Sequence, residues 1–168
     1  IYCSQADVYI DPWRPVKKAI ITHGHADHSR YGHKKYITHH LNIPIIKHRL
    51  GKINVSGVEW KENFTINNVK FSLHPAGHII GSSQVRVEYN GEVWVVSGDY
   101  KTEDDGVSGA FQPIKCHSFI TECTFGLPVF KWQPQKEVFD EMNNWWKDNQ
   151  DNNMTSVVMV YSLGKAQR

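Results

Sequence analysis

The sequence predicts a mixed α/β fold in which β-strands dominate the first part of the chain. Short apolar stretches alternate with polar residues through residues 53–96, as in strands that bury one face. Two asparagine turns, Asn67-Asn68 and Asn90-Gly91, join such stretches as hairpins. A longer pattern with a helical period begins near Gln135. We therefore expect consecutive strands followed by a helix.

The composition allows one hydrophobic core. The chain has 168 residues, of which 40% are hydrophobic and 21% are charged, and no apolar run approaches a membrane span. No secretory leader is recognisable, so we expect neither export nor a membrane partner. Cys3, Cys116 and Cys123 are odd in number and lack CxxC spacing, which is typical of reduced thiols. These features predict a cytoplasmic location.

The first strands surround a turn that begins at Asp11. Apolar stretches before and after this turn predict strands at Val8–Ile10 and Lys18–Ile21. Two further short strands are expected at Tyr36–Thr38 and Ile43–Ile46.

The two hairpins follow in the middle of the chain. Their strands are expected at Phe64–Ile66, Val69–Leu73, Gln84–Tyr89 and Glu92–Val96. Each hairpin leads into a loop that contains a histidine or an aspartate. Later, an amphipathic helix is expected from Gln135, and a buried strand over Ser156–Tyr161.

Three histidines and an aspartate lie within six positions directly after the apolar run Ala19–Ile21, in the order HxHxDH. A strand that ends in such a loop brings imidazoles and a carboxylate to one point, as a zinc site requires. His23 and His25 alternate and can reach one ion from the same side, whereas Asp27 and His28 point toward a neighbouring position. The loop predicts two metal ions. The alternative is a histidine-rich surface loop.

Two later loops supply the ligands that this site still lacks. His78 would complete three nitrogen ligands for the first metal, and the Asp99 carboxylate can bridge both ions. Each residue by itself is more typical of a packed histidine or a turn aspartate, but with the HxHxDH loop both are interpreted as ligands.

Asp11 is expected to support the site without binding metal. It lies near the strand end that faces the metal loop, where a carboxylate can orient a metal-bound histidine through its free ring nitrogen. The alternative is an ordinary turn aspartate before a proline.

These motifs resemble those of metallo-β-lactamase-fold proteins. Besides HxHxDH, the chain has GHxxGS at Gly77–Ser82 and GD at Gly98-Asp99. The resemblance implies the N-terminal part of an αββα sandwich and two Zn²⁺ ions. Small-molecule hydrolases of this fold continue the first motif as DHxGG, whereas this chain continues as Ser29-Arg30-Tyr31-Gly32. That difference disfavours a small-molecule substrate.

Within this fold the chain is similar to the β-CASP nucleases, and among them to bacterial ligase-associated DNA exonucleases. The segments that carry this resemblance are Tyr9–Val16, His23–His28, Thr121–Gly126 and Tyr161–Arg168. The resemblance implies a partial metallo-β-lactamase-like core over residues 1–126 and the start of a β-CASP domain over residues 127–168. It also implies a further ligand histidine beyond Arg168, so we expect a chain truncated at its C-terminus.

The resemblance implies a zinc-dependent phosphodiester hydrolase, and more narrowly a DNA exonuclease that processes DNA ends in DNA repair. Asp27 would orient the nucleophile as well as bind metal. Glu122, at the acidic position of the Thr121–Gly126 segment, would orient a ligand or handle a proton of the leaving group. The expected partners are nucleic acid, with DNA favoured over RNA, and a DNA ligase or a helicase.

Three alternatives stay open at this stage. An RNA-processing β-CASP ribonuclease would use the same kind of site. A small-molecule hydrolase would cleave thioesters or lactams instead. A binding protein with a degenerate site is disfavoured, because all the ligand residues that the motifs require before Arg168 are present.

The distribution of charge favours a polyanionic substrate. The net charge is only +2, but residues 1–60 contain nine Lys and Arg against four Asp and Glu. A basic first third around a metal loop suits phosphates, although scattered solvated lysines would give the same count.

Overall fold

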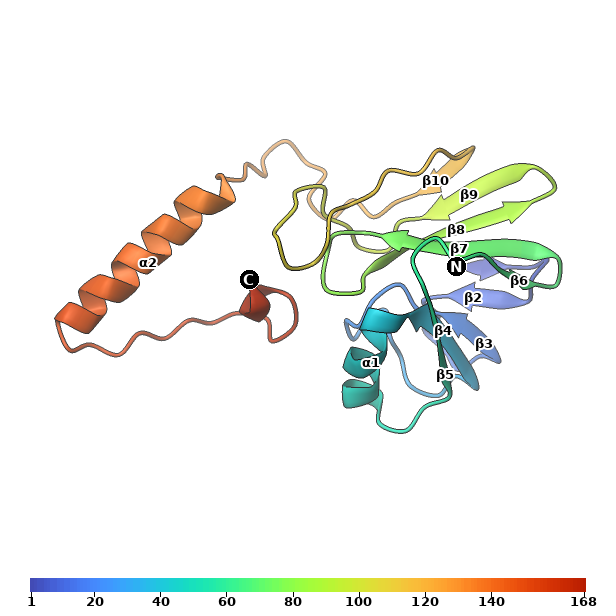
Figure 1. The fold of residues 1–168 in the computed structure, drawn as a ribbon, viewed down its shortest axis with the longest axis horizontal. Helices are drawn as coiled ribbons and strands as arrows, with labels where there is room; N and C mark the ends of the chain where they lie inside the picture. The colour runs from blue at the N-terminus through green and yellow to red at the C-terminus, as the bar shows by residue number, and fades with distance from the viewer.

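The core of the protein is a pair of five-stranded β-sheets, seen in a computed structural model that describes residues 1–168 (Figure 1). The strands of the first sheet are, in spatial order, β1 (Tyr2–Cys3), β2 (Val8–Ile10), β3 (Lys18–Ile20), β4 (Lys35–His39) and β5 (Val55–Val58). β1 pairs antiparallel with β2, whereas β2 to β5 are parallel. The loops that leave β2 and β3 therefore start from the same edge of the sheet.

The second sheet is built mainly from the two predicted hairpins. Its strands are, in spatial order, β6 (Phe64–Ile66), β7 (Val69–Pro75), β8 (Ser83–Tyr89), β9 (Glu92–Val96) and β10 (Ser118–Ile120). The first turn has φ angles of +47° at Asn67 and +65° at Asn68, and the second has +49° at Asn90 and +83° at Gly91. Asn and Gly tolerate this left-handed conformation, which a tight hairpin requires. Both hairpins are confirmed.

The hydrophobic core lies between the two sheets. Phe71 and Leu73 of β7 are fully buried, and fully burying one such side chain contributes about 1.5–3 kcal/mol. The core cluster draws on both sheets, through Ala6, Val8, Ile10, Ile20, Ile37, Val58, Val69, Phe71, Leu73, Val85 and Val96. This packing confirms the α/β prediction of two sheets around one core.

A helix, α1 (Ile43–Leu50), follows the short 3₁₀ turn η1 (His40–Asn42) and packs beside the first sheet (Figure 1). The expected strand at Ile43–Ile46 is wrong, because these residues begin α1. Pro44 lies in the first turn, where its missing N–H leaves no intrahelical bond unmade. Ile46 is fully buried, and Leu50 packs one turn later against the outer face of the sheet. A short apolar run is compatible with either element, and tertiary packing decides.

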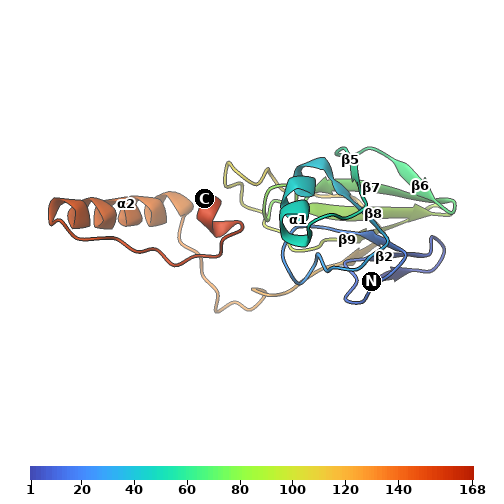
Figure 2. The same cartoon turned by 90° about the horizontal axis from the view of Figure 1, so that it is seen from below.

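The chain beyond residue 126 lies outside the sandwich. Helix α2 (Gln135–Asp151) begins at the predicted residue, projects away from both sheets and buries none of its side chains (Figures 1 and 2). The expected buried strand at Ser156–Tyr161 is wrong: the segment forms no strand, and Met159 is 93% exposed. No strand lies beside it to pair with its backbone. The domain division at residue 126 stays a prediction.

The last turn, η2 (Lys165–Gln167), returns to the side of the sandwich (Figure 1). None of the helices combines the length and the apolar character that crossing a membrane requires.

Candidate metal centre

Three loops that each follow a strand converge at one end of the sandwich. The HxHxDH loop follows β3, the loop with His78 follows β7, and Asp99 follows β9. The Ser83 amide, at the start of β8 and directly after the loop with His78, donates to the Thr22 carbonyl over 2.9 Å, which holds the first two loops together. A Cβ at Gly98, whose φ is +56°, would lie 2.8 Å from the Thr22 Cβ. The third loop can therefore approach the first only because residue 98 is a glycine.

Four side chains from these loops form a first group. The ligand atoms of His23, His25, His78 and Asp99 all lie within 4.8 Å of one another. Nδ1 of His25 lies 3.0 Å from Nε2 of His23 and 3.1 Å from Nε2 of His78. The Asp99 Oδ2 atom is 3.7 Å from Nε2 of both His23 and His78. Three imidazoles and a carboxylate are ligands that zinc takes in proteins.

Burial keeps two of these imidazoles in the form that can bind a metal. Burial and the neighbouring His28 lower the pKa of His23 well below its usual value, against the opposing charge of Asp99. Burial also lowers the pKa of His78, again against Asp99. A neutral imidazole offers a lone pair, which is what a metal ion requires. The donor set of the first group therefore fits zinc.

His28 and Asp27 lie on the other side of Asp99. Nε2 of His28 is 3.2 Å from Oδ1 of Asp99 and 3.6 Å from Oδ2 of Asp27. The Asp27 side chain is 64% exposed, so it faces the solvent side of the site. The two oxygens of Asp99 thus face two different sets of side chains, and a carboxylate placed in this way can contact two metal ions.

His28 and Asp99 stabilise each other's charged forms. Burial lowers the pKa of His28, but hydrogen bonds with Asp11 and Asp99 outweigh it and raise the pKa to about 10. Burial raises the pKa of Asp99, but the hydrogen bond with His28 and the charges of the neighbouring histidines lower it to about 2. Metal binding at His28 would displace a proton from the ring.

Polar groups behind the histidines orient their rings. Oδ2 of Asp11 is 2.7 Å from Nδ1 of His28, and its Oδ1 accepts a 2.8 Å hydrogen bond from the Thr22 amide. The Thr22 hydroxyl lies 3.0 Å from Nδ1 of His23. These contacts leave Nε2 of both rings facing Asp99. Asp11 lies where the sequence analysis expects it, whereas Thr22 was missed because a threonine after a strand has no distinctive signal.

Two further orienting contacts come from outside the HxHxDH loop. The Ser82 hydroxyl accepts hydrogen bonds from the amides of His78 and Ile79, at 3.0 Å and 3.2 Å. Ser82 is the last residue of GHxxGS, so its signal was present in the sequence. Nε2 of His25 lies 3.1 Å from the carbonyl oxygen of Leu163, which is 138 positions away. No sequence pattern identifies a backbone carbonyl as such a partner.

Glu122 lies beside the candidate metal centre and is not one of the four clustered side chains. It follows β10, and its carboxylate accepts hydrogen bonds from the amides of Tyr100 and Thr124, at 3.4 Å and 3.0 Å. Its charge acts to raise the pKa of His78, an effect that is smaller than that of burial. Glu122 is therefore within electrostatic reach of the first group.

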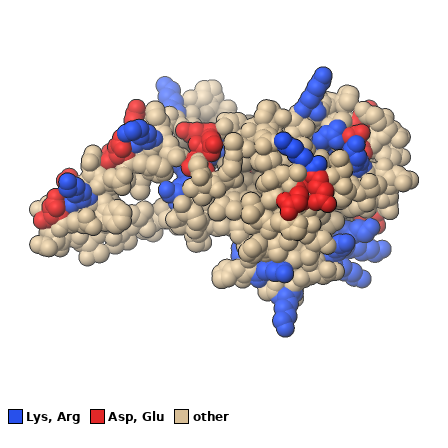
Figure 3. Space-filling model, viewed as in Figure 1, with Lys and Arg blue, Asp and Glu red and all other residues tan.

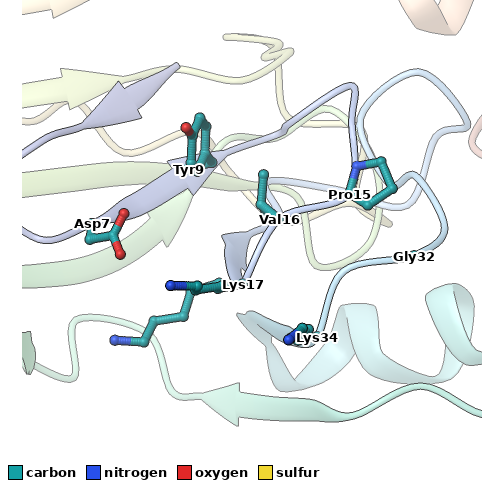
Figure 4. Close-up of a pocket in the computed structure, with 8 residues that line it drawn as sticks. Asp7, Tyr9, Pro15, Val16, Lys17, Gly32 and Lys34 are labelled. Carbon is teal, nitrogen blue, oxygen red and sulfur yellow. The ribbon is translucent and has the colours of Figure 1, made fainter.

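Basic side chains gather around the first sheet. Figure 3 shows mainly Lys and Arg over the part of the molecule that contains this sheet and α1. In contrast, α2 carries both basic and acidic side chains. Lys17, Lys34 and Asp7, which Figure 4 labels, and Lys18 line a hollow of about 400 Å³. These lysines lie at the starts of β3 and β4, the ends opposite to the metal loop, so the hollow is separate from the metal centre.

No protein-family model matches the chain. Among curated proteins, the chain is 26% identical over 172 residues to a "Probable DNA ligase" of Opitutus terrae, covering 99% of this chain and 17% of that protein. It is 25% identical over 182 residues to an "RNase J-like protein" of Methanocaldococcus jannaschii, covering 92% of this chain and 42% of that protein. It is 25% identical over 115 residues to "Endoribonuclease YSH1" of Yarrowia lipolytica, covering 67% of this chain and 14% of that protein. The chain thus spans less than half the length of each of these relatives.

Proposed function

Because the chain is related to metallo-β-lactamase-fold nucleases of the β-CASP type, we propose that it carries the metal centre of a zinc-dependent nuclease that hydrolyses phosphodiester bonds. This proposal is based on the position of Asp99. Its Oδ2 lies 3.7 Å from Nε2 of His23, and its Oδ1 lies 3.2 Å from Nε2 of His28. A carboxylate between two sets of imidazoles is suited to holding two metal ions side by side.

In this proposal the first zinc ion would be held by His23, His25 and His78, and the second by Asp27 and His28, with Asp99 shared. When bound, such a pair of ions makes a hydroxide available near neutral pH and stabilises charge on a phosphate. The chemistry of the donor set supports the assignment, since imidazole and carboxylate are ordinary zinc ligands.

Two carboxylates are proposed to act on the reacting groups. Asp27 would orient the nucleophile, and its exposed side chain, 3.6 Å from His28, is free to reach it. Glu122 would orient a ligand or handle a proton of the leaving group. The amides of Tyr100 and Thr124 hold its carboxylate at the edge of the site. Asp11 would keep His28 in the orientation that metal binding needs.

DNA ends are the proposed substrate, and a DNA ligase or helicase is the proposed partner. The match that covers 99% of the chain, to a probable DNA ligase, supports both DNA and the ligase. RNA is the second candidate, because the other two relatives are named as an endoribonuclease and an RNase J-like protein. A small-molecule substrate has no such support.

The arrangement of the chain supports two further parts of the proposal. Residues 127–168, which lie outside the sandwich, would be the start of a β-CASP domain beside the core of residues 1–126 (Figure 1). The three cysteines are free thiols, which supports a cytoplasmic location.

Zinc content tests the metal centre. The complete protein should bind zinc, and His25→Ala should remove most of it, because His25 Nδ1 contacts both His23 and His78. His48→Ala, an exposed histidine on α1, is the matched control. Unchanged zinc in His25→Ala, measured by elemental analysis, would overturn the ligand assignment.

Cleavage assays test the substrate. Labelled single-stranded DNA, duplex DNA and RNA of matched sequence should be compared on the complete, zinc-loaded protein, with a thioester and a lactam as further substrates. We expect cleavage of DNA from its ends. A large preference for RNA would move the protein to the ribonuclease candidate, and hydrolysis of only the thioester or lactam would overturn the nuclease proposal.

A further inference from the structure

Trp13 is a large aromatic side chain that the fold leaves open to solvent. It is 76% exposed, so it contributes little to the core. The guanidinium carbon of Arg30 lies 4.8 Å from the centre of its ring, a cation–π distance. Arg30 therefore backs one side of the ring while most of the Trp13 surface remains available to a ligand.

The position of this pair follows from the metal centre. Trp13 comes two residues after Asp11, and Arg30 comes two residues after His28. Asp11 and His28 are hydrogen-bonded at 2.7 Å, so the two loops leave the metal centre together and meet again at Trp13 and Arg30. Tyr31, which follows Arg30, is 71% exposed and adds a second aromatic side chain to the same loop.

We propose that Trp13, backed by Arg30, is a stacking platform for a nucleobase of an unpaired strand whose phosphate lies at the metal centre. This inference rests on the proposed nuclease function and adds the way in which the substrate is held. Every base has a π-face, so an exposed indole ring binds single strands with little sequence preference. The neighbouring cation Arg14 is exposed as well and suits the strand's phosphates.

If Trp13 and Arg30 have only a structural role, replacing Trp13 should affect ligand binding in a different way. If Trp13 only holds the Arg30 guanidinium in place, its removal would change stability and would weaken every ligand equally. A stacking platform instead makes the effect of Trp13 depend on whether the ligand carries a base at the matching position.

The test is a comparison of Trp13→Ala with the unchanged protein on two oligonucleotides. One is a fluorescein-labelled single strand with phosphorothioate linkages that slow hydrolysis, and the other is the same strand with abasic residues near its end. We expect Trp13→Ala to weaken binding of the base-bearing strand about 10-fold and to leave binding of the abasic strand nearly unchanged. Trp13→Phe, which keeps an aromatic face, should retain most of the affinity.

Trp94→Ala is the matched control, because Trp94 is 45% exposed on β9, outside these loops. DNA and RNA versions of both strands show which nucleic acid supplies the base. Equal weakening of base-bearing and abasic strands, or no effect of Trp13→Ala, would overturn the platform. Base-dependent binding of these strands, without cleavage of the same strands made with ordinary phosphodiester linkages, would instead overturn the nuclease function and leave the platform standing.

Discussion

Asp11 and His28 are joined by a hydrogen bond of 2.7 Å between Oδ2 and Nδ1, which ties the turn after β2 to the metal loop after β3. The bond determines which nitrogen of His28 is free: Nε2 faces Asp99, 3.2 Å away. Two loops whose residues are 17 positions apart therefore orient the His28 ring together.

Asp11→Asn should weaken the second zinc ion selectively. Loss of the carboxylate removes the group that orients His28, and such changes behind a ligand cost about 10–100-fold in metal affinity. Zinc titration against a competing chelator should show a second site weakened by that factor and a first site close to normal. Asp7→Asn is the control, since Asp7 and Asp11 have similar φ angles of +47° and +45°. Equal loss at both sites would contradict the assignment.

Asp27→Asn should reduce turnover far more than it reduces substrate binding. Asp27 is exposed at the site, and its proposed task is to orient the nucleophile rather than to hold the substrate. We expect turnover to fall about 100-fold or more, with the Kd for nucleic acid changed little. Single-turnover cleavage and binding anisotropy separate the two quantities. Asp140→Asn, on the exposed face of α2, serves as the control, and near-normal cleavage by Asp27→Asn would refute the role.

Gly164→Ala should weaken the first zinc ion through the contact between His25 and Leu163. Gly164 has a φ of +99°, and a Cβ there would lie 2.7 Å from Cγ2 of the buried Ile79. The added methyl group should push the Leu163 carbonyl away from Nε2 of His25, which lies 3.1 Å from it. We expect zinc affinity to fall about 10-fold with little change in Tm, because this segment lies outside the core.

Gly51→Ala is the matched control for Gly164→Ala. Gly51 also has a positive φ, +71°, but a Cβ there would meet nothing within 4 Å. Chelator competition should therefore separate the two variants. Similar zinc affinities in both would mean that the Leu163 contact has no role in orienting His25.

Asp105 should make the free energy of unfolding decrease as the pH falls through the acid range. Burial raises the pKa of this carboxyl, but hydrogen bonds with Lys101, with the amides of Ser108 and Val107 and with the Ser108 hydroxyl outweigh it, so the pKa lies well below its usual 3.8. Because the pKa of Asp105 is lower in the folded protein than in the unfolded chain, its ionised form stabilises the fold fully at pH values above the unfolded-chain pKa. This stabilisation is lost as the pH falls from that pKa toward the lower pKa of the folded protein.

The measurement is the free energy of unfolding in urea between about pH 6 and pH 2. Asp105→Asn should lose about 2 kcal/mol at the upper end and show a flatter dependence below about pH 4. Asp104→Asn is the control, because Asp104 is exposed and accepts only one hydrogen bond, from Gly106. Parallel pH profiles for Asp105→Asn and the unchanged protein would contradict the prediction.

Local sequence was sufficient to predict the two hairpins and the first residue of α2. Asn67-Asn68 and Asn90-Gly91 adopt the left-handed angles that their turns need, and this depends on the residues themselves. It was insufficient at Ile43–Ile46, where the same apolar residues suit a strand or a helix. It also failed at Ser156–Tyr161, because an apolar stretch becomes a strand only when a neighbouring strand pairs with it.

The sequence by itself determined the types of side chain at the candidate metal centre and the strand ends that carry them, and its motifs predicted the relationship to nucleases that the named relatives confirm. Only the tertiary structure decided how these side chains are arranged. The position of Asp99 between His23 and His28 depends on the packing of two sheets, and the Leu163 carbonyl reaches His25 across 138 positions. The physical reason is that ligand chemistry belongs to single residues, whereas the distance between ligands depends on how strands from different parts of the chain pack around a shared core.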